Sequence, residues 1–183
     1  PYWVAAATAL LEESSVGVGT VIGFPHGSNK PAIKAAEAER ACDDGATELD
    51  MVVNISRVMS GDWDYVQADI AAVIELAHAA GQKVKVIFEN CYLDESQKLM
   101  LCKICTELNA DWVKTSTGFG TGGATVEDIK LMVENTPDTV QVKAAGGIRD
   151  LDSLLEMRAL GASRVGASRT QGILDECRQR LGE

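Results

Sequence analysis

The sequence predicts an α/β protein that contains most of a (β/α)8 barrel. Short apolar runs rich in Val and Ile alternate with amphipathic helical runs from one end of the chain to the other. Six such runs begin roughly 30 residues apart, the length that one strand and its crossover helix require. Serial βα units of this kind form a parallel sheet with helices outside it. The chain has 183 residues, which is short for a complete barrel of about 250 residues.

Glycines mark where the predicted strands begin. Gly45, Gly81 and Gly161 each follow a helical pattern and precede a strand. A left-handed helix cap is expected at such a place, and glycine adopts it without a Cβ clash. The six predicted strands are Gly19–Phe24, Glu48–Val53, Lys83–Phe88, Trp112–Thr115, Val140–Ala144 and Arg164–Ala167.

Helical patterns lie before, between and after these strands. Pro1 suits the first turn of an opening helix, and Pro31 suits the first turn of the next one. Asp150 is the expected N-cap of a later helix, and Ile173–Leu181 is predicted to be helical. Apolar stripes recur at Val66, Ile70, Val73, Ile74 and Ala77, and at Leu101, Ile104, Cys105 and Leu108.

An eight-stranded barrel needs two strands more than the six predicted here. In a βα protein each helix follows a strand, so a chain that begins with a helix lacks the strand before it. We therefore expect residues 1–183 to form a single barrel domain that is incomplete at its N-terminus. Such a chain is a fragment, a truncated gene product or a chain that relies on another segment. An open, doubly wound sheet of six strands is the alternative, and pattern alone does not separate the two.

Composition and charge limit the classes of function. Hydrophobic residues make up 46% and charged residues 24%, as in soluble globular proteins. No apolar run approaches the roughly 20 residues that span a bilayer, and the N-terminus has no basic leader, so we expect a cytoplasmic protein. The net charge of −10 argues against a nucleic acid partner. Backbone amides and a few lysines can still hold one phosphate.

The five cysteines are an odd number without the spacing of a disulfide framework, which indicates reduced thiols. Cys102 and Cys105 form a single C-x-x-C motif on an apolar helical stripe, where core packing is favoured over a redox or metal role. The two histidines are too few for a triad of histidine ligands. The sequence therefore indicates no metal site.

Two lysines lie inside successive apolar strands. Lys114 precedes a loop that contains Gly118, and Lys143 precedes Gly146 and Gly147. In a parallel sheet these lysines are neighbours, so mutual repulsion and desolvation lower an ammonium pKa from about 10.4. A neutral lysine amine is the nucleophile that forms a Schiff base with a carbonyl. The alternative is that each lysine simply extends to solvent at the end of its strand.

Acidic residues in the predicted strands are candidate partners for these lysines. Glu48 and Asp50 share one face of their strand, opposite Leu49 and Met51. An inward Asp50 is expected to pair with a lysine or to relay a proton, and a purely structural ion pair is the alternative. Glu89 is a weaker acid candidate, for which a structural role is favoured.

Glycines cluster after the last three predicted strands. They are Gly118, Gly120, Gly122 and Gly123, then Gly146 and Gly147, then Gly166, which precedes Ser168. Glycine lets backbone N–H groups approach a phosphate closely. A phosphate site after the last two strands is frequent in (β/α)8 barrels. The sequence therefore predicts a phosphate site beside the two lysines.

Four segments together resemble the deoxyribose-phosphate aldolases, a family of class I, Schiff-base aldolases. Trp112–Phe119 (WVKTSTGF) is similar to the Schiff-base lysine motif of that family, and Val142–Arg149 (VKAAGGIR) is similar to its second-lysine and phosphate-loop motif. Thr20–Pro25 (TVIGFP) and Asp44–Val52 (DGATELDMV) also resemble family segments. The resemblance is ordered and covers essentially the whole chain.

The resemblance implies a (β/α)8 barrel that reversibly cleaves 2-deoxy-D-ribose 5-phosphate to D-glyceraldehyde 3-phosphate and acetaldehyde in deoxynucleoside catabolism. It implies that Lys114 forms the imine, that Lys143 lowers the pKa of this amine and assists proton movement, and that Asp50 joins the proton relay. The implied phosphate site consists of Gly118, Gly146, Gly147, Gly166 and Ser168. No metal or organic cofactor is implied, because the imine is the electron sink. A homodimer is the expected assembly.

The sequence departs from the family pattern at two places. The polar Asp-His-Thr motif of the family's first strand has no counterpart here, and Arg169 stands where the family often has a second serine.

Two alternative functions remain open. One is another phosphosugar barrel enzyme, either a different Schiff-base aldolase or an isomerase that uses lysine. The other is a catalytically silent remnant that binds phosphate or acts as a scaffold.

Overall fold

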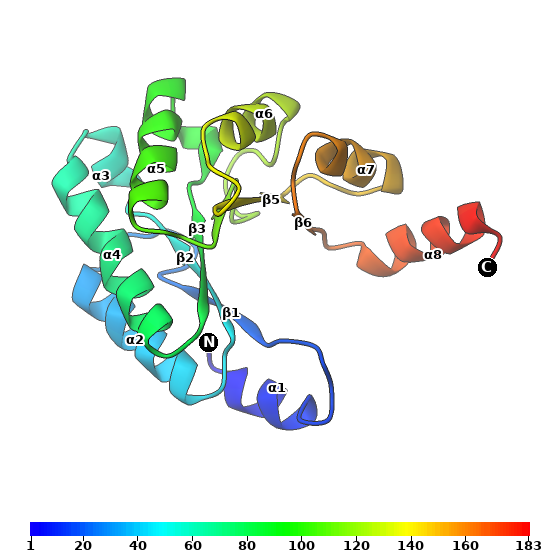
Figure 1. Ribbon diagram of the computed structural model, residues 1–183, viewed down its shortest axis with the longest axis horizontal. Coiled ribbons are helices and arrows are strands. Elements are labelled where there is room, and N and C mark those ends of the chain that lie inside the picture. The colour runs from blue at the N-terminus through cyan, green and yellow to red at the C-terminus, as the bar shows by residue number, and fades with distance from the viewer.

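The computed structural model describes residues 1–183 and shows one sheet of six parallel strands, which lie in the sheet in the same order as in the chain (Figure 1). Each strand pairs with its neighbours in the sequence, and the order never reverses. A doubly wound sheet reverses its order at a switch point. The uninterrupted order therefore supports the barrel prediction over the open-sheet alternative. The strands are β1 (Gly19–Ile22), β2 (Glu48–Val52), β3 (Lys83–Ile87), β4 (Trp112–Lys114), β5 (Gln141–Ala145) and β6 (Arg164–Gly166).

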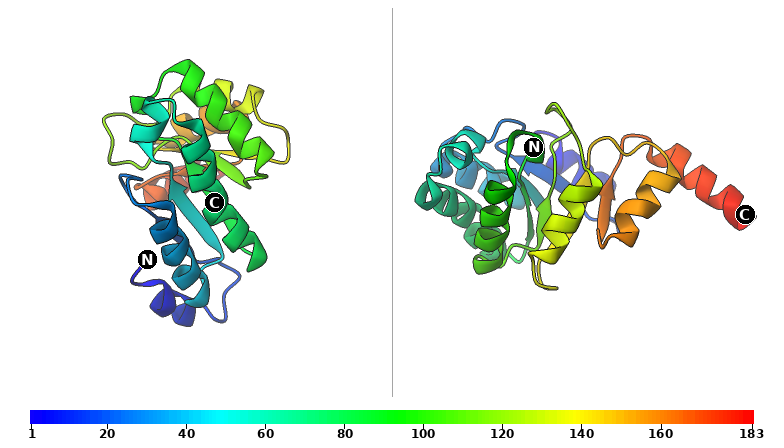
Figure 2. Two further views of the ribbon diagram at one scale, coloured as in Figure 1. Left: turned by 90° about the vertical axis from the view of Figure 1, so that its left-hand side faces the viewer. Right: turned by 90° about the horizontal axis from the view of Figure 1, so that it is seen from above.

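The helices lie around the outside of the curled sheet, and α8 (Thr170–Leu181) extends away from it at the β6 end (Figures 1 and 2). None of them combines the length and apolarity that a bilayer crossing requires. The α-helices are α1 (Val4–Leu10), α2 (Pro31–Asp43), α3 (Ile55–Met59), α4 (Trp63–Ala79), α5 (Glu95–Glu107), α6 (Val126–Glu134), α7 (Leu151–Ala159) and α8 (Thr170–Leu181), and η1 (Asn90–Tyr92) is a short 3-10 helix.

The local signals in the sequence produce the element boundaries. All six predicted strands are present, with ends that differ from the prediction by one or two residues. Pro31 begins α2, and the Asp150 side chain accepts a hydrogen bond from the Ser153 N–H at 2.8 Å as the N-cap of α7. The three glycines predicted as caps have positive φ: Gly45 (97°), Gly81 (73°) and Gly161 (108°). The five-residue helix α3 was not predicted, because it is too short to show a periodic pattern.

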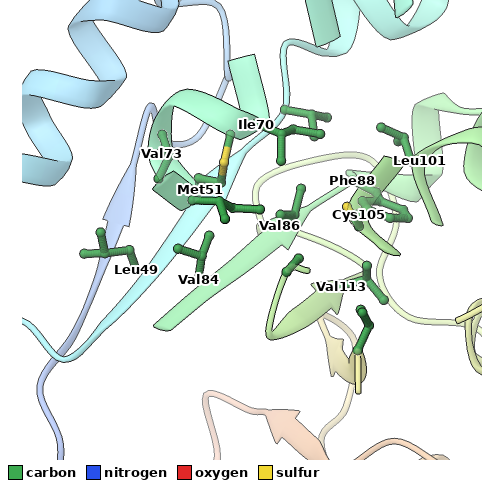
Figure 3. Close-up of a cluster of buried hydrophobic side chains, with 14 of the residues drawn as sticks. Leu49, Met51, Ile70, Val73, Val84, Val86, Phe88, Leu101, Cys105 and Val113 are labelled. Atoms are coloured by element: carbon green, nitrogen blue, oxygen red, sulfur yellow. The ribbon is translucent and has the colours of Figure 1, made fainter. Parts of the chain in front are cut away.

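Apolar side chains fill the space between the sheet and its helices. Leu49 and Met51 of β2 are fully buried there with Ile70 of α4 (Figure 3). Alternation along each strand sends these residues outward to the helices and leaves the other face for the barrel interior. Cys102 and Cys105 of α5 belong to this core, as predicted, and burial raises the pKa of the Cys102 thiol to about 12. The hydrophobic core thus lies outside the sheet.

A fully buried ion pair joins two helices to the end of β2. The Lys34 ammonium of α2 lies 2.6 Å from the Asp69 carboxylate of α4, and neither side chain is exposed. Lys34 also donates to the Val52 carbonyl at 2.8 Å, and Asp69 accepts the Asn54 N–H at 3.2 Å. Because Val52 and Asn54 follow Asp50 closely, this pair fixes the carboxyl end of the strand that carries the predicted acid.

Replacing one partner of this pair is expected to destabilise the fold strongly. Asp69→Leu leaves the Lys34 ammonium buried without a counter-charge, which costs about 3–5 kcal/mol. The free energy of unfolding, measured by urea denaturation, reports this loss. The double variant Lys34→Met/Asp69→Leu is expected to recover at least half of it, because no lone charge remains buried. A double variant as unstable as Asp69→Leu alone would show that the charge is not the cause.

Candidate active site

The barrel interior carries charged side chains on the faces of β2 to β5 that point away from the core. Since Leu49 and Met51 face the helices, Asp50 faces inward. The strand register aligns Asp50 with Lys85 of β3, and Lys114 of β4 with Lys143 of β5. The sheet therefore brings one acid and three lysines from four adjacent strands to neighbouring positions.

Asp50 is the common partner of all three lysines. Its Oδ2 atom lies 2.7 Å from the Lys114 Nζ and 3.0 Å from the Lys143 Nζ. Its Oδ1 atom lies 2.8 Å from the Lys85 Nζ. Asp50 is only 7% exposed and Lys114 only 8%, so these charges are largely removed from water. The three residues predicted from the sequence to be catalytic thus meet at one carboxylate.

More charged side chains lie on the same interior face, nearer the amino ends of the strands. Glu48 accepts hydrogen bonds from Lys85 and from Arg164 of β6, each at 2.6 Å. Arg164 stacks over the Trp112 ring, with 4.4 Å between its Cζ atom and the ring centroid. The interior cluster therefore holds four cations and two carboxylates. This local excess of positive charge stands in a chain with a net charge of −10, and it favours an anionic ligand.

The neighbouring charges set the protonation of the cluster. Burial alone would raise the pKa of Asp50, but Lys114, Lys143 and Lys85 together hold it well below its ordinary value. Burial lowers the pKa of Lys143 from its ordinary value, and the attraction of Asp50 opposes this effect only in part. Asp50 is thus ionised at neutral pH, and Lys143 gives up its proton more readily than a lysine in water.

A cavity of about 380 Å³ opens beside the two lysines. Besides Lys114 and Lys143, it is lined by all of the residues predicted for the phosphate site: Gly118, Gly146, Gly147, Gly166 and Ser168. A hollow of about 660 Å³ lies beside α1, near the amino ends of β1 and β2, and its only ionisable residues are Glu12, Asp43 and Asp44. We assign the chemistry to the smaller of these two cavities, because of the two only this one is lined by lysines.

Backbone N–H groups in this cavity lack partners within the chain. None of Gly118, Gly147 and Ser168 donates its N–H to another protein atom. Gly118 and Gly147 have φ values of 88° and 81°, which L-residues with a side chain rarely adopt. Free amides beside a local excess of positive charge are suited to bind the oxygens of a phosphate.

Thr115, the residue after β4, forms hydrogen bonds that connect the ends of β4 and β5. Its hydroxyl donates to the Ala145 carbonyl at 3.0 Å and accepts the Ala145 N–H at 3.1 Å. The loop after β4 also lies against the loop after β5, since a Cβ on Gly123 would lie 2.4 Å from the carbonyl of Gly146. The two lysines and the two glycine loops therefore form one connected unit.

Three residues of the site were not predicted from the sequence as site residues. Lys85 contacts Asp50 and Glu48, Arg164 contacts Glu48, and Thr115 locks β4 to β5. Alternation within Lys83–Ile87 was a usable signal for Lys85, because the apolar Val84 and Val86 face the core. No comparable signal marked Thr115, since its hydrogen bonds depend on the position of the next strand.

Comparison with known proteins places the whole chain in a family. A profile of the DeoC/LacD family aldolases matches residues 4–174. The deoxyribose-phosphate aldolase of Rhodopirellula baltica is 62% identical over 182 residues, which cover 100% of this chain and 76% of that protein.

Solved structures show the same fold. The structure titled "QR15, an Aldolase" superposes with a TM-score of 0.92 at 38% identity, over 100% of this chain and 82% of that one. A deoxyribose phosphate aldolase from Aeropyrum pernix, described as a tetramer, superposes with a TM-score of 0.90 at 30% identity, over 98% of this chain and 76% of that one. The α/β barrel prediction and the resemblance read from the sequence are both confirmed.

Asp50 is expected to make the fold sensitive to acid. Its pKa is lower in the folded chain than in the unfolded one, so its stabilisation is complete above the unfolded pKa of about 3.9 and is lost as pH falls below it. Between pH 5 and pH 3 the free energy of unfolding should fall by about 1 kcal/mol more in the unmodified chain than in Asp50→Asn. Urea denaturation at both pH values measures this difference, and equal losses would contradict the assignment.

Proposed function

The chain belongs to the DeoC/LacD aldolase family, and we propose that it reversibly cleaves 2-deoxy-D-ribose 5-phosphate to D-glyceraldehyde 3-phosphate and acetaldehyde. The observation that carries the proposal is the pair of lysines on adjacent strands that share the Asp50 Oδ2 atom and line one cavity. The relative from Rhodopirellula baltica bears the name of this activity. A lysine pair beside unpartnered amides suits a substrate with a carbonyl at one end and a phosphate at the other.

Lys114 is the proposed nucleophile. Its side chain is 10% exposed, against 18% for Lys143, so it lies deeper beside the same carboxylate. The segment around it, Trp112–Phe119, resembles the Schiff-base lysine motif of the family. After a base has removed a proton from its ammonium group, the Nζ atom attacks the aldehyde carbon C1 of the open-chain sugar, and loss of water leaves an iminium ion.

The iminium ion accepts the electrons of the bond that breaks. A base removes the proton of the C3 hydroxyl, the C2–C3 bond breaks, and its electron pair forms an enamine on C1 and C2. The C3 end leaves as the aldehyde of D-glyceraldehyde 3-phosphate. Protonation of C2 and addition of water then release acetaldehyde and restore the Lys114 amine. Because the imine is the electron sink, these steps call for no metal or organic cofactor.

Lys143 and Asp50 are the proposed proton carriers. Burial lowers the pKa of Lys143, which brings this amine closer to a neutral working pH, where a general acid or base is most effective. Asp50 stays ionised between the two amines, so it holds both and accepts a proton only briefly or through water. The three side chains thus form one relay around the imine nitrogen.

The phosphate is proposed to lie against the glycine loops. Gly118, Gly146, Gly147, Gly166 and Ser168 line the same cavity as the two lysines, and Gly118, Gly147 and Ser168 donate their N–H to no other protein atom. The excess positive charge of the interior cluster adds long-range attraction for the anion. We extend the proposal to residues 1–183 as part of a single aldolase barrel domain, and to a homodimer in the cytoplasm without nucleic acid or membrane partners.

Trapping with borohydride tests the nucleophile. With acetaldehyde present, reduction is expected to leave an ethyl adduct on Lys114, which peptide mass mapping identifies. Lys114→Arg should lose the adduct, because the guanidinium stays protonated. An adduct on Lys143 would reverse the roles of the two lysines. A folded chain without any adduct would refute the imine mechanism and favour the silent-remnant alternative.

Lys143→Met tests the proton relay. Removal of a general acid–base group is expected to lower kcat by about 100-fold or more, with KM changed by less than about threefold. Cleavage of 2-deoxy-D-ribose 5-phosphate is measured by coupling the triose phosphate to a dehydrogenase. A variant that keeps its kcat would remove Lys143 from the mechanism.

A further inference from the structure

A buried glutamate lies directly behind the loop that follows Lys114, and none of the proposed steps uses it. Glu89, just after β3, is only 2% exposed. Its Oε1 atom accepts the Thr117 N–H at 3.0 Å, and its Oε2 atom accepts the Thr117 hydroxyl. A buried carboxylate is costly unless donors satisfy it, and Thr117 supplies two of them. The two residues are therefore strongly fixed relative to each other.

The rest of the loop is arranged around this contact. The Thr117 hydroxyl oxygen accepts the Phe119 N–H at 3.0 Å. Gly120 packs against the same carboxylate, since a Cβ there would lie 3.0 Å from the Glu89 Cδ atom. Gly118 lies between these fixed residues and keeps its N–H free beside the cavity. The position of the Gly118 amide thus follows from the position of Glu89.

The backbone at Glu89 is strained. Its φ and ψ values are both 59°, in the left-handed region that residues with a side chain rarely adopt. Hydrogen bonds on both sides hold this conformation: the Phe88 N–H donates to the Lys114 carbonyl at 3.0 Å, and the Asn90 N–H donates to the Thr115 carbonyl at 2.9 Å. The segment Phe88–Asn90 therefore binds the main chain at Lys114 and Thr115 and also orients the Glu89 carboxylate toward Thr117.

Glu89 does not reach the cavity that holds the lysines. It lines a separate small cavity of about 70 Å³, and Thr117 lines both. The threonine therefore separates the carboxylate from any ligand of the lysine cavity. A negative charge so placed organises the loop without facing a bound anion directly.

We propose that Glu89 is a positioning residue for the anionic end of the substrate. It fixes Thr117, and through Thr117 it holds the Gly118 N–H where a phosphate oxygen binds. The inference rests on the proposed function for the identity of the substrate, but its binding step concerns the phosphate alone. Loss of the Glu89 contact should therefore weaken phosphate binding and leave imine formation intact.

Two substitutions of Glu89 test this role. Glu89→Gln keeps the size of the side chain but replaces one acceptor oxygen with an NH2 group. Glu89→Gly removes the carboxylate and also relieves the left-handed strain. In both variants KM for 2-deoxy-D-ribose 5-phosphate and Ki for inorganic phosphate are expected to rise about tenfold, while kcat and the rate of acetaldehyde trapping on Lys114 stay within about twofold. An unchanged Ki in both variants would overturn the proposal.

A double-variant cycle tests the route through Thr117. If Glu89 acts through Thr117, Glu89→Gln combined with Thr117→Val should raise Ki no more than the larger single effect. Independent, multiplied effects would overturn the proposal. Glu75→Gln, on the exposed side of α4, is the matched control for the loss of one negative charge. If this control raised Ki equally, net charge would be the cause and Glu89 would have no special role.

The experiment also separates this inference from the proposed function. If the unmodified chain forms an adduct and cleaves the sugar phosphate, but the Glu89 variants bind phosphate normally, only the role of Glu89 fails. If the unmodified chain gives neither adduct nor cleavage, the proposed function fails. Calorimetric titration with inorganic phosphate then still measures whether the Glu89 variants bind the anion about tenfold more weakly.

Discussion

The Asp50 carboxylate allows three lysines from three strands to occupy the same interior. Without it, Lys85, Lys114 and Lys143 would face one another with little water to screen them. The rest of the structure serves this contact. Alternation in β2 turns Asp50 inward because its neighbours are core residues, the strand register aligns it with Lys85, and the buried Lys34–Asp69 pair holds the end of its strand.

The architecture and the residues around Asp50 could be predicted from the sequence, because both depend on local patterns. Alternation assigns each strand residue to a face, so Asp50, Lys114 and Lys143 could be predicted to meet. The missed features depend on where two strands lie relative to each other. The contact of Lys85 with Asp50 requires the register of β2 and β3, and the hydrogen bonds of Thr115 require the position of Ala145. The left-handed backbone of Glu89 has no marker at all in the sequence, since glutamate rarely adopts it.

Stability and chemistry are divided between the two faces of one sheet. The outward face is almost entirely apolar and packs against the helices, whereas the inward face carries an excess of positive charge. Each strand contributes side chains to both faces, because its residues alternate between them. The loops at the carboxyl ends complete the site, and hydrogen bonds from residues such as Glu89 and Thr115 hold them in addition to core contacts such as those of Phe88 and Ile148.

The strand order has a consequence for how the protein assembles. Every strand pairs with its immediate predecessor in the chain, so the sheet can grow one βα unit at a time as synthesis proceeds. The charge contacts are different, since Asp50 and Lys143 lie 93 residues apart and Glu48 and Arg164 lie 116 residues apart. They form only after β5 and β6 have docked. Neighbouring strands can therefore pair through contacts that are close in the sequence, whereas these two ion pairs require the whole stretch from β2 to β6 to be folded.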